Sequence, residues 1–161
     1  MDFERLKKIL GVGPLGALMS LVLIAIAAGV DRYADLGAIT RHGTAAGLAG
    51  GLLMILGIGL HGWSFMTLRA WWGRDQLCTG GPFRFVRHPM YAAWISLVAP
   101  GLVLILNRWI FVIWLVGLHV LWHGLVPREE HTMIRIFGDA YRTYASRTGR
   151  FLPRSSNRSS D

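Results

Sequence analysis

The chain has 161 residues, of which 53% are hydrophobic and 16% are charged, and its formal net charge is +8. Soluble domains average roughly 25% charged and 45–50% apolar residues, so this composition excludes an ordinary soluble fold. It is also far too hydrophobic for a disordered chain. The single cysteine, Cys78, excludes an internal disulfide framework and a cysteine-based zinc cluster.

Four stretches of the chain carry no Asp, Glu, Lys or Arg, and a helix needs about 20 apolar residues, within a range of about 17–25, to cross a bilayer. They are residues 14–30, 43–68, 88–107 and 109–127. Backbone groups in lipid must bond internally, which favours helices. We therefore predict an all-α integral membrane protein with four transmembrane helices, in which residues 1–153 form a single membrane domain. The Ser/Asn/Arg-rich residues 154–161 are expected to be a disordered tail.

The basic residues are distributed unevenly between the two ends of these spans. Fourteen lie before the first span, between the second and third, or after the fourth, and only Arg32, Arg41 and Arg108 lie on the other side. The positive-inside rule therefore places both termini in the cytoplasm. The net charge is thus a topology signal and an attraction for anionic lipid, and we expect no nucleic-acid partner.

Three features of the spans bear on packing and on metal binding. Only Asn107 and Arg108 separate the third and fourth spans, which must then be antiparallel neighbours. Gly47 and Gly51 form a small-xxx-small pair, which is typical of a helix-packing face. His119 and His123 have metal-ligand spacing, but no third ligand stands at a fixed distance. We therefore expect no metal site, and the two histidines to line the bundle or a pocket.

The loop before the third span ends in an Arg-His-Pro sequence. Pro89 suits the first turn of a helix, because its missing N–H is not needed there. Arg87 and His88 then lie at a helix N-terminus, where free N–H groups and the helix dipole favour an anion such as a carboxylate. The alternative is an interfacial pair that contacts lipid phosphate.

The segment after the fourth span carries two adjacent acids. We expect Pro127 to break or bend the helix and an amphipathic helix to follow along the cytoplasmic interface. Glu129 and Glu130 lie on or beside its apolar face, so a cation should meet them: Arg87, His88 or a ligand. The alternative is a helix first turn in which the dipole favours acids. The apolar face itself comprises Met133, Ile136, Phe137, Ala140, Tyr141 and Tyr144.

Several of these motifs, taken in order, resemble one enzyme superfamily. They are residues 81–91, Glu129-Glu130, residues 137–144 and residues 150–153. Together they resemble the isoprenylcysteine carboxyl methyltransferase and phospholipid methyltransferase superfamily of integral membrane enzymes, and the likeness extends over about residues 77–153. One departure is Ala93, where the family often has glycine.

The resemblance implies S-adenosylmethionine as the methyl donor, with S-adenosylhomocysteine as the product, bound near the cytoplasmic face by residues 77–153. By their match to the family motifs, the cofactor-binding residues are Arg87, His88, Pro89, Tyr91, Glu129, Glu130, Tyr141 and Tyr144, and Arg87, His88 and Glu130 are expected to be catalytic. The chemistry agrees with this assignment. A helix N-terminus with Arg87 and His88 suits the donor's carboxylate, a Glu suits its ammonium, and aromatic faces suit its adenine and sulfonium.

The acceptor implied first is lipophilic and carries a carboxylate, as in isoprenylcysteine carboxyl O-methylation, which needs no general base. The alternative is N-methylation of an ethanolamine phospholipid, where a base such as His88 or one Glu must first remove a proton. Two further alternatives are an NADPH-dependent enzyme resembling sterol reductases and a non-catalytic membrane accessory protein. The Glu pair suits a cofactor that bears an amino acid better than it suits NADPH.

Overall fold

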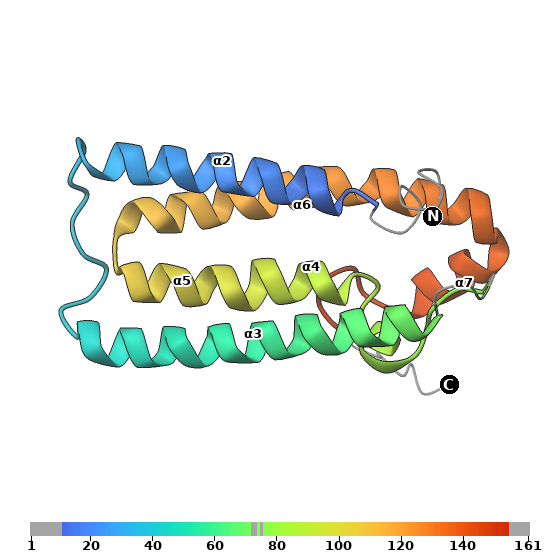
Figure 1. Ribbon diagram of the computed structural model, residues 1–161. Coiled ribbons are helices and arrows are strands. Elements are labelled where there is room, and N and C mark those ends of the chain that lie inside the picture. Colours follow the sequence, from blue (N-terminus) through green and yellow to red (C-terminus); the bar gives the residue numbers. More distant parts are fainter. Residues whose placement is uncertain (1–10, 72–73, 75, 155–161) are drawn as a thin grey trace, which may run out of the picture.

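A computed structural model describes residues 11–71, 74 and 76–154, and it is an antiparallel bundle of four long helical segments (Figure 1). All four are long and apolar enough to span a membrane, which confirms the all-α membrane fold. In order they are α2 (Gly13–Asp31), α3 (Gly43–Trp71), a third crossing made of α4 (Pro89–Ala93), η2 (Trp94–Val98) and α5 (Ala99–Leu106), and α6 (Trp109–Phe137). Beyond Arg154, the tail expected at residues 154–161 lies outside the described residues.

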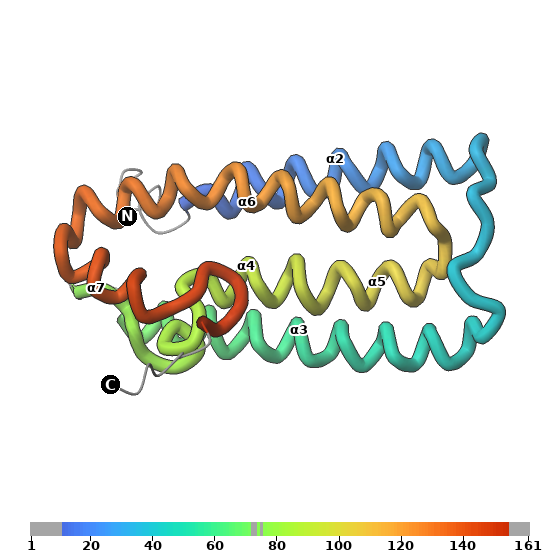
Figure 2. Tube along the Cα trace, turned by 180° about the vertical axis from the view of Figure 1, so that it is seen from behind, coloured from blue at the N-terminus to red at the C-terminus, as the bar shows by residue number. Residues whose placement is uncertain are grey.

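The bundle consists of two helix pairs, because α2 packs along α6 and α3 packs along the third crossing (Figures 1 and 2). Two glycines let α3 approach closely. A Cβ on Gly50 would lie 2.5 Å from the carbonyl oxygen of Gly101, and a Cβ on Gly57 would lie 2.6 Å from Val98 Cγ2. The prediction that Gly47 and Gly51 form the packing face is wrong: no described atom of a neighbouring helix lies within 4 Å of where their Cβ atoms would be. The spacing identifies small residues without identifying the side of the helix that meets a partner.

The third crossing is not a uniform α-helix. One turn of π-helix, η2, precedes Pro100, whose ring displaces the carbonyl four residues earlier and whose nitrogen carries no proton. The crossing ends at Asn107, which adopts the left-handed conformation that asparagine tolerates (φ 51°). Its side chain accepts a hydrogen bond from Thr40 N–H (3.0 Å) and donates one to the Thr40 carbonyl (2.9 Å). The predicted two-residue connection to α6 is therefore confirmed. Hydrogen bonds join it to the linker between α2 and α3.

Of the break or bend expected at Pro127, the break is wrong, because α6 continues through this residue to Phe137. Proline is tolerated in membrane helices when neighbouring contacts hold the helix together, and the buried Leu125 and Val126 precede it on a helix packed against α2. The break lies at Gly138 (φ 54°, ψ −127°), after which α7 (Asp139–Arg147) begins. The break divides the predicted apolar face between two helices, but Met133 and Phe137 of α6 and Tyr141 and Tyr144 of α7 line the same cavity. The location of α7 at a membrane interface stays a prediction.

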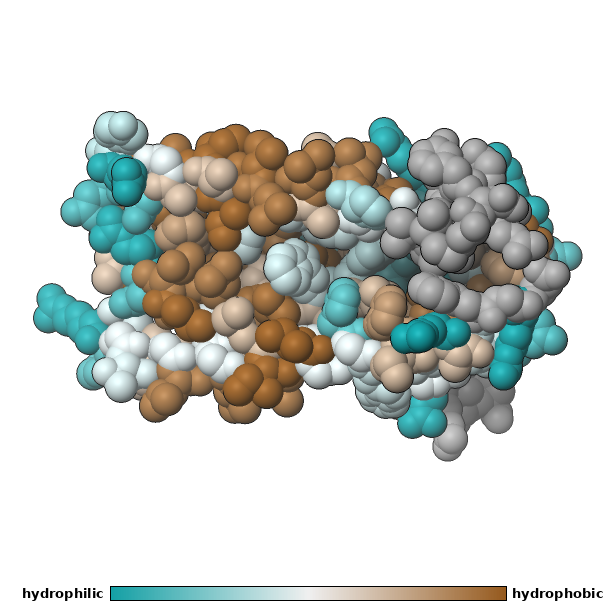
Figure 3. All heavy atoms as spheres, in the orientation of Figure 1, coloured by the Kyte–Doolittle hydropathy of each residue, from teal (hydrophilic) through white to brown (hydrophobic). Residues whose placement is uncertain are grey.

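On the face that Figure 3 shows, apolar side chains cover the left and central part of the bundle, and hydrophilic side chains gather at its left end and around the right end. Large aliphatic side chains stand on the outer surface of the bundle with most of their area exposed, for example Leu48 (74%), Ile55 (69%) and Val120 (69%). A surface of this size and polarity needs lipid around it. The chain is therefore an integral membrane protein.

Candidate functional site

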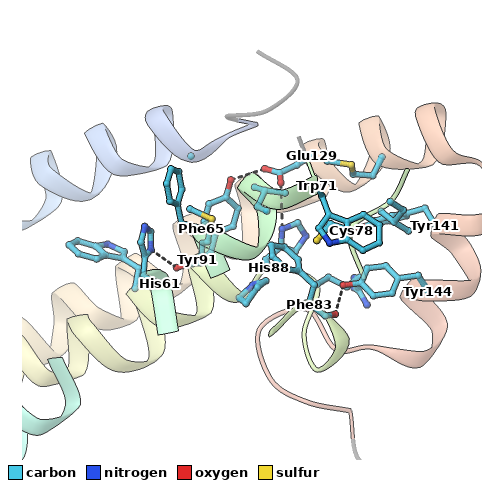
Figure 4. Close-up of a pocket in the computed structure, with 18 of the residues that line it drawn as sticks. His61, Phe65, Trp71, Cys78, Phe83, His88, Tyr91, Glu129, Tyr141 and Tyr144 are labelled. Atoms are coloured by element: carbon cyan, nitrogen blue, oxygen red, sulfur yellow. Dashed lines mark hydrogen bonds and ion pairs between the residues drawn. The ribbon is translucent and has the colours of Figure 1, made fainter. Parts of the chain in front are cut away.

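A cavity of about 520 Å³ opens at the end of the bundle where α3 ends and α4 begins. Its wall combines side chains of α2, α3, α4, α6 and α7 with the connection between α3 and α4. Figure 4 shows its labelled residues in a row, from His61 and Phe65 at one end, past Tyr91, His88 and Glu129, to Tyr141 and Tyr144 at the other. The size is typical of a small-molecule site.

An ion cluster built around Glu130 lies behind this cavity. Arg87 donates from Nε to Glu130 Oε1 (3.0 Å), with Nη2 at 2.9 Å, and Arg150 donates from Nη2 to Oε2 (2.6 Å). His88 Nε2 lies 3.4 Å from Oε1. Glu130 thus contacts two guanidinium groups and an imidazole although it is only 13% exposed. These groups compensate the charge of its buried carboxylate.

Glu129, the neighbouring acid, faces the cavity and has a different set of partners. Its Oε2 accepts hydrogen bonds from the Tyr91 hydroxyl (2.9 Å) and the Val12 N–H (3.1 Å), and its Oε1 lies 3.6 Å from His88 Nδ1. The two acids therefore have different roles. Glu130 neutralises the surrounding cations, and Glu129 presents a carboxylate to the cavity.

His88 bridges the two acids and is 6% exposed. Burial lowers the pKa of this imidazole, but the hydrogen bonds and negative charges of Glu129 and Glu130 raise it by more, so the pKa lies above its usual value. The two carboxylates therefore favour the protonated ring, and Nε2, which is buried 3.4 Å from Glu130 Oε1, makes no hydrogen bond in the described structure. Pro89, directly after it, is fully buried and fixes the start of α4.

The segment after α7 holds the loop before α4 in place. Arg87 N–H donates to the Gly149 carbonyl (2.8 Å) and His88 N–H to the Arg150 carbonyl (3.1 Å), which pairs the two segments in parallel. The Arg87 side chain also donates from Nη1 to the carbonyls of Ala145 (2.9 Å) and Thr148. Arg87 thus connects α4, α6 and the C-terminal segment.

Two tyrosines of α7 form the far end of the cavity. The Tyr141 and Tyr144 rings lie edge to face with centroids 6.1 Å apart, and the Tyr144 hydroxyl donates to the Phe83 carbonyl (2.6 Å). Burial, with the charge of Glu130, raises the pKa of Tyr141 to about 12, and burial also raises the pKa of Tyr144. Both phenols are therefore neutral aromatic surfaces at physiological pH.

The structure brings most of the predicted site residues together. Arg87, His88, Tyr91 and Glu129 lie on the cavity wall and in one network of hydrogen bonds and ion pairs, and Tyr141 and Tyr144 lie on the same wall. Glu130 belongs to the network but not to the wall, and the cation expected against the acids is present as Arg87 and His88.

Two parts of the site are missing from the sequence-based prediction. One is Arg150, which was noted only within the motif of residues 150–153 and binds Glu130. The other is the turn before α2, where Val12 binds Glu129 and a Cβ on Gly11 would overlap that carboxylate. The only local signal for the turn is the Gly-Val-Gly-Pro sequence of residues 11–14, which reads as an ordinary helix start.

His119 and His123 lie outside this site and line a second cavity of about 240 Å³ with Ser96 and Arg150. Each ring's Nδ1 pairs with the carbonyl four residues earlier. Within residues 11–71, 74 and 76–154, no three His, Cys, Asp or Glu side chains are grouped as metal ligands.

Residues 45–140 match the family model of the phospholipid methyltransferases. The match covers more than half of the chain and runs from α3 to the first residues of α7. The chain therefore belongs to the phospholipid methyltransferase family, and it is a membrane methyltransferase. No curated protein sequence matches the chain significantly.

Proposed function

We propose that this protein transfers a methyl group from S-adenosylmethionine to a lipophilic acceptor at the cytoplasmic face of the membrane. The observation that carries the proposal is the carboxylate of Glu129, which faces a cavity between a cationic cluster and an aromatic wall. Methyltransferases of this family generally use that donor. The many basic residues at this end of the bundle support the cytoplasmic orientation.

The residues of the cavity suit each charged part of the donor. Glu129 would bind the ammonium group, and the cationic Arg87 and His88 on the wall would attract the carboxylate. Tyr91 would keep the Glu129 carboxylate oriented through its hydrogen bond. Glu130 would act from behind the wall by holding Arg87 in place.

The opposite end of the site suits the rest of the molecule. The faces of Tyr141 and Tyr144 offer an uncharged aromatic surface for adenine, and aromatic faces also favour a sulfonium through cation–π attraction. The donor supplies an electrophilic methyl group, and the protein's contribution is to align the acceptor with it and to exclude water.

Two acceptor classes are consistent with this cavity. A carboxylate, as in isoprenylcysteine O-methylation, attacks without losing a proton, and the charge cancellation on the way to the transition state is favoured in a dry site. An amine of an ethanolamine phospholipid must first be deprotonated. A pH–rate profile separates them, because only the amine gives a rate that rises through a base ionisation.

Calorimetry of the purified chain in mild detergent tests the donor site. S-adenosylhomocysteine should bind at micromolar protein concentration, and NADPH should not. Glu129→Gln and Glu130→Gln should each lose most of this binding, whereas Asp139→Asn should keep it, because Asp139 is 92% exposed and pairs only with Arg142 on α7 in the described structure. Unchanged binding in both Glu variants would show that the site is misassigned. No binding by the wild type would reject the methyltransferase proposal.

A further inference from the structure

One histidine on the cavity wall lies inside the membrane-spanning part of the bundle. His61 is ten residues before the end of α3 at Trp71, which is about 15 Å along the helix axis. It stands in the charge-free stretch of residues 43–68, where an ionisable residue is a functional hypothesis by default. Figure 4 shows it at the end of the cavity away from Tyr141 and Tyr144.

The contacts of His61 indicate which ring nitrogen carries the proton. Its Nδ1 lies 3.4 Å from the carbonyl oxygen of Met90 in α4. A carbonyl oxygen only accepts hydrogen bonds, so this contact needs the proton on Nδ1. In the neutral ring Nε2 then keeps its lone pair and is a proton acceptor.

The other titratable groups of the wall are occupied or protonated. From α6, Glu129 accepts hydrogen bonds from Tyr91 of α4 and from Val12. His88 lies between Glu129 and Glu130, whose charges raise its pKa. Arg87 donates to Glu130. The remaining titratable groups, Cys78, Tyr141 and Tyr144, have pKa values raised by burial. Within the described wall, this leaves His61 Nε2 as the proton acceptor that stands apart from the ion cluster.

The cavity wall also carries apolar side chains, which suit a lipid better than the zwitterionic donor. They include Phe65 of α3, which Figure 4 shows near His61, and, elsewhere on the same wall, Ala17 of α2, Trp94 of η2 and Trp122 of α6. The charged groups that suit a zwitterion are gathered further along, at His88 and Glu129. We therefore expect the acceptor's reacting group at the end of the cavity that holds His61.

We infer that His61 is the general base for an acceptor whose nucleophile is an amine, such as the headgroup of phosphatidylethanolamine; this rests on the proposed function. His61 Nε2 takes a proton from the acceptor's ammonium group. The freed nitrogen lone pair forms a bond to the sulfonium methyl carbon, and the S–CH3 electron pair returns to sulfur. The products are an N-methylammonium lipid and S-adenosylhomocysteine, and His61 releases its proton to water. A carboxylate acceptor has no proton to give, so its methylation would not need His61 as a base.

Methylation of phosphatidylethanolamine in nanodiscs tests this assignment with His61→Gln and the matched variant His119→Gln. His119 also lies in a membrane-spanning helix, but it lines the second cavity. The wild-type rate should rise with pH and reach a plateau. His61→Gln should fall by about 100-fold or more near neutral pH and recover as alkaline pH deprotonates the lipid amine. His119→Gln should follow the wild type, and all three proteins should bind S-adenosylhomocysteine equally.

A second readout does not depend on turnover. The ¹⁵N spectrum of histidine-labelled protein should contain neutral rings with the proton on Nδ1 and a bare Nε2, among them His119, His123 and His131, whose Nδ1 atoms also pair with carbonyls. The difference between the wild-type and His61→Gln spectra should be one ring of this kind, which assigns it to His61. A proton on Nε2 would overturn the inference. So would a His61→Gln profile identical to the wild type, or methylation of N-acetyl-S-farnesylcysteine instead of phosphatidylethanolamine. In those cases intact S-adenosylhomocysteine binding keeps the proposed function standing, whereas a wild type that binds none fails both.

Discussion

At the scale of single residues, the position of Glu129 depends on a glycine that is more than a hundred positions away in sequence. Gly11 has φ +51°, and a Cβ there would overlap Glu129 Oε2. We expect Gly11→Ala to displace the carboxylate and to lower S-adenosylhomocysteine affinity by at least about tenfold, a loss of about 1.4 kcal/mol. The left-handed backbone adds a stability cost of about 1–2 kcal/mol, visible in the melting temperature.

Gly13→Ala is the matched control for this change. The nearest atom to a Cβ at Gly13 is the Tyr91 hydroxyl at 3.4 Å, and its backbone is not left-handed. We expect calorimetry to show nearly wild-type affinity for this variant. Equal losses in both variants would mean that the turn before α2 tolerates no change at all, and the specific contact between Gly11 and Glu129 would not be the cause.

His88 makes the stability of the protein depend on pH. The pKa of His88 is raised in the folded state, so its protonation stabilises the fold fully below the unfolded pKa, and this contribution is lost as the pH rises through the folded pKa. Over the pH range above the ordinary histidine value of about 6.5, the melting temperature of the wild type should fall towards that of His88→Asn. A difference between the two proteins that is constant over this range would contradict a protonated His88 between the acids.

At the scale of elements, the break between α6 and α7 decides where the two tyrosines lie. Gly138 has a backbone conformation (φ 54°, ψ −127°) that other residues rarely adopt. Gly138→Ala should therefore rotate or extend α7, withdraw Tyr141 and Tyr144 from the cavity, and weaken S-adenosylhomocysteine binding measured by calorimetry. Gly124→Ala is the control inside α6, because no described atom lies within 4 Å of its added Cβ. That variant should bind normally, and weakened binding there would mean that helix glycines matter generally.

The same elements show what the sequence predicts well. The limits of the first three spans agree with the structure within about three residues. A long run without charged residues directly indicates which part of the chain can lie in lipid. The end of the fourth is wrong by ten residues. Pro127 predicts a break or a bend, but α6 continues through it in a helix that packs against α2, and this packing outweighs the missing hydrogen bond. Contacts between helices therefore outweigh the local tendency of proline to end a helix. No sequence pattern near Pro127 indicates those contacts.

For the site, the motifs predict which residues take part, but they do not predict the different contacts that each residue makes. Glu129 and Glu130 are adjacent in sequence and equivalent as a motif, yet one faces the cavity and the other faces Arg87 and Arg150. Which acid turns inward depends on the phase of α6 after Pro127. The contacts from Val12 and Arg150 come from chain ends that the helical pattern leaves unplaced.

At the scale of the whole molecule, two helix pairs joined at one end leave the cavity at the other, near one face of the membrane (Figures 1 and 2). Cys78 is the only cysteine in the chain and lies on the wall of that cavity, so it reports both on the orientation of the bundle and on what fills it. Burial raises the pKa of its thiol, so the reactive thiolate is scarce at neutral pH.

A membrane-impermeant maleimide should therefore label Cys78 slowly, about tenfold faster for each pH unit below the thiol pKa, and only from the cytoplasmic side. Inverted vesicles should be labelled and intact right-side-out vesicles should not, with Cys78→Ser as the blank. S-adenosylhomocysteine should slow labelling of the inverted vesicles, because it would occupy the cavity on whose wall the thiol lies. The Glu129→Gln variant should lose that protection but should still be labelled only from the cytoplasmic side.

Labelling from the outer side would reverse the proposed orientation. Labelling that ignores S-adenosylhomocysteine, in a protein that binds it, would place the donor outside this cavity.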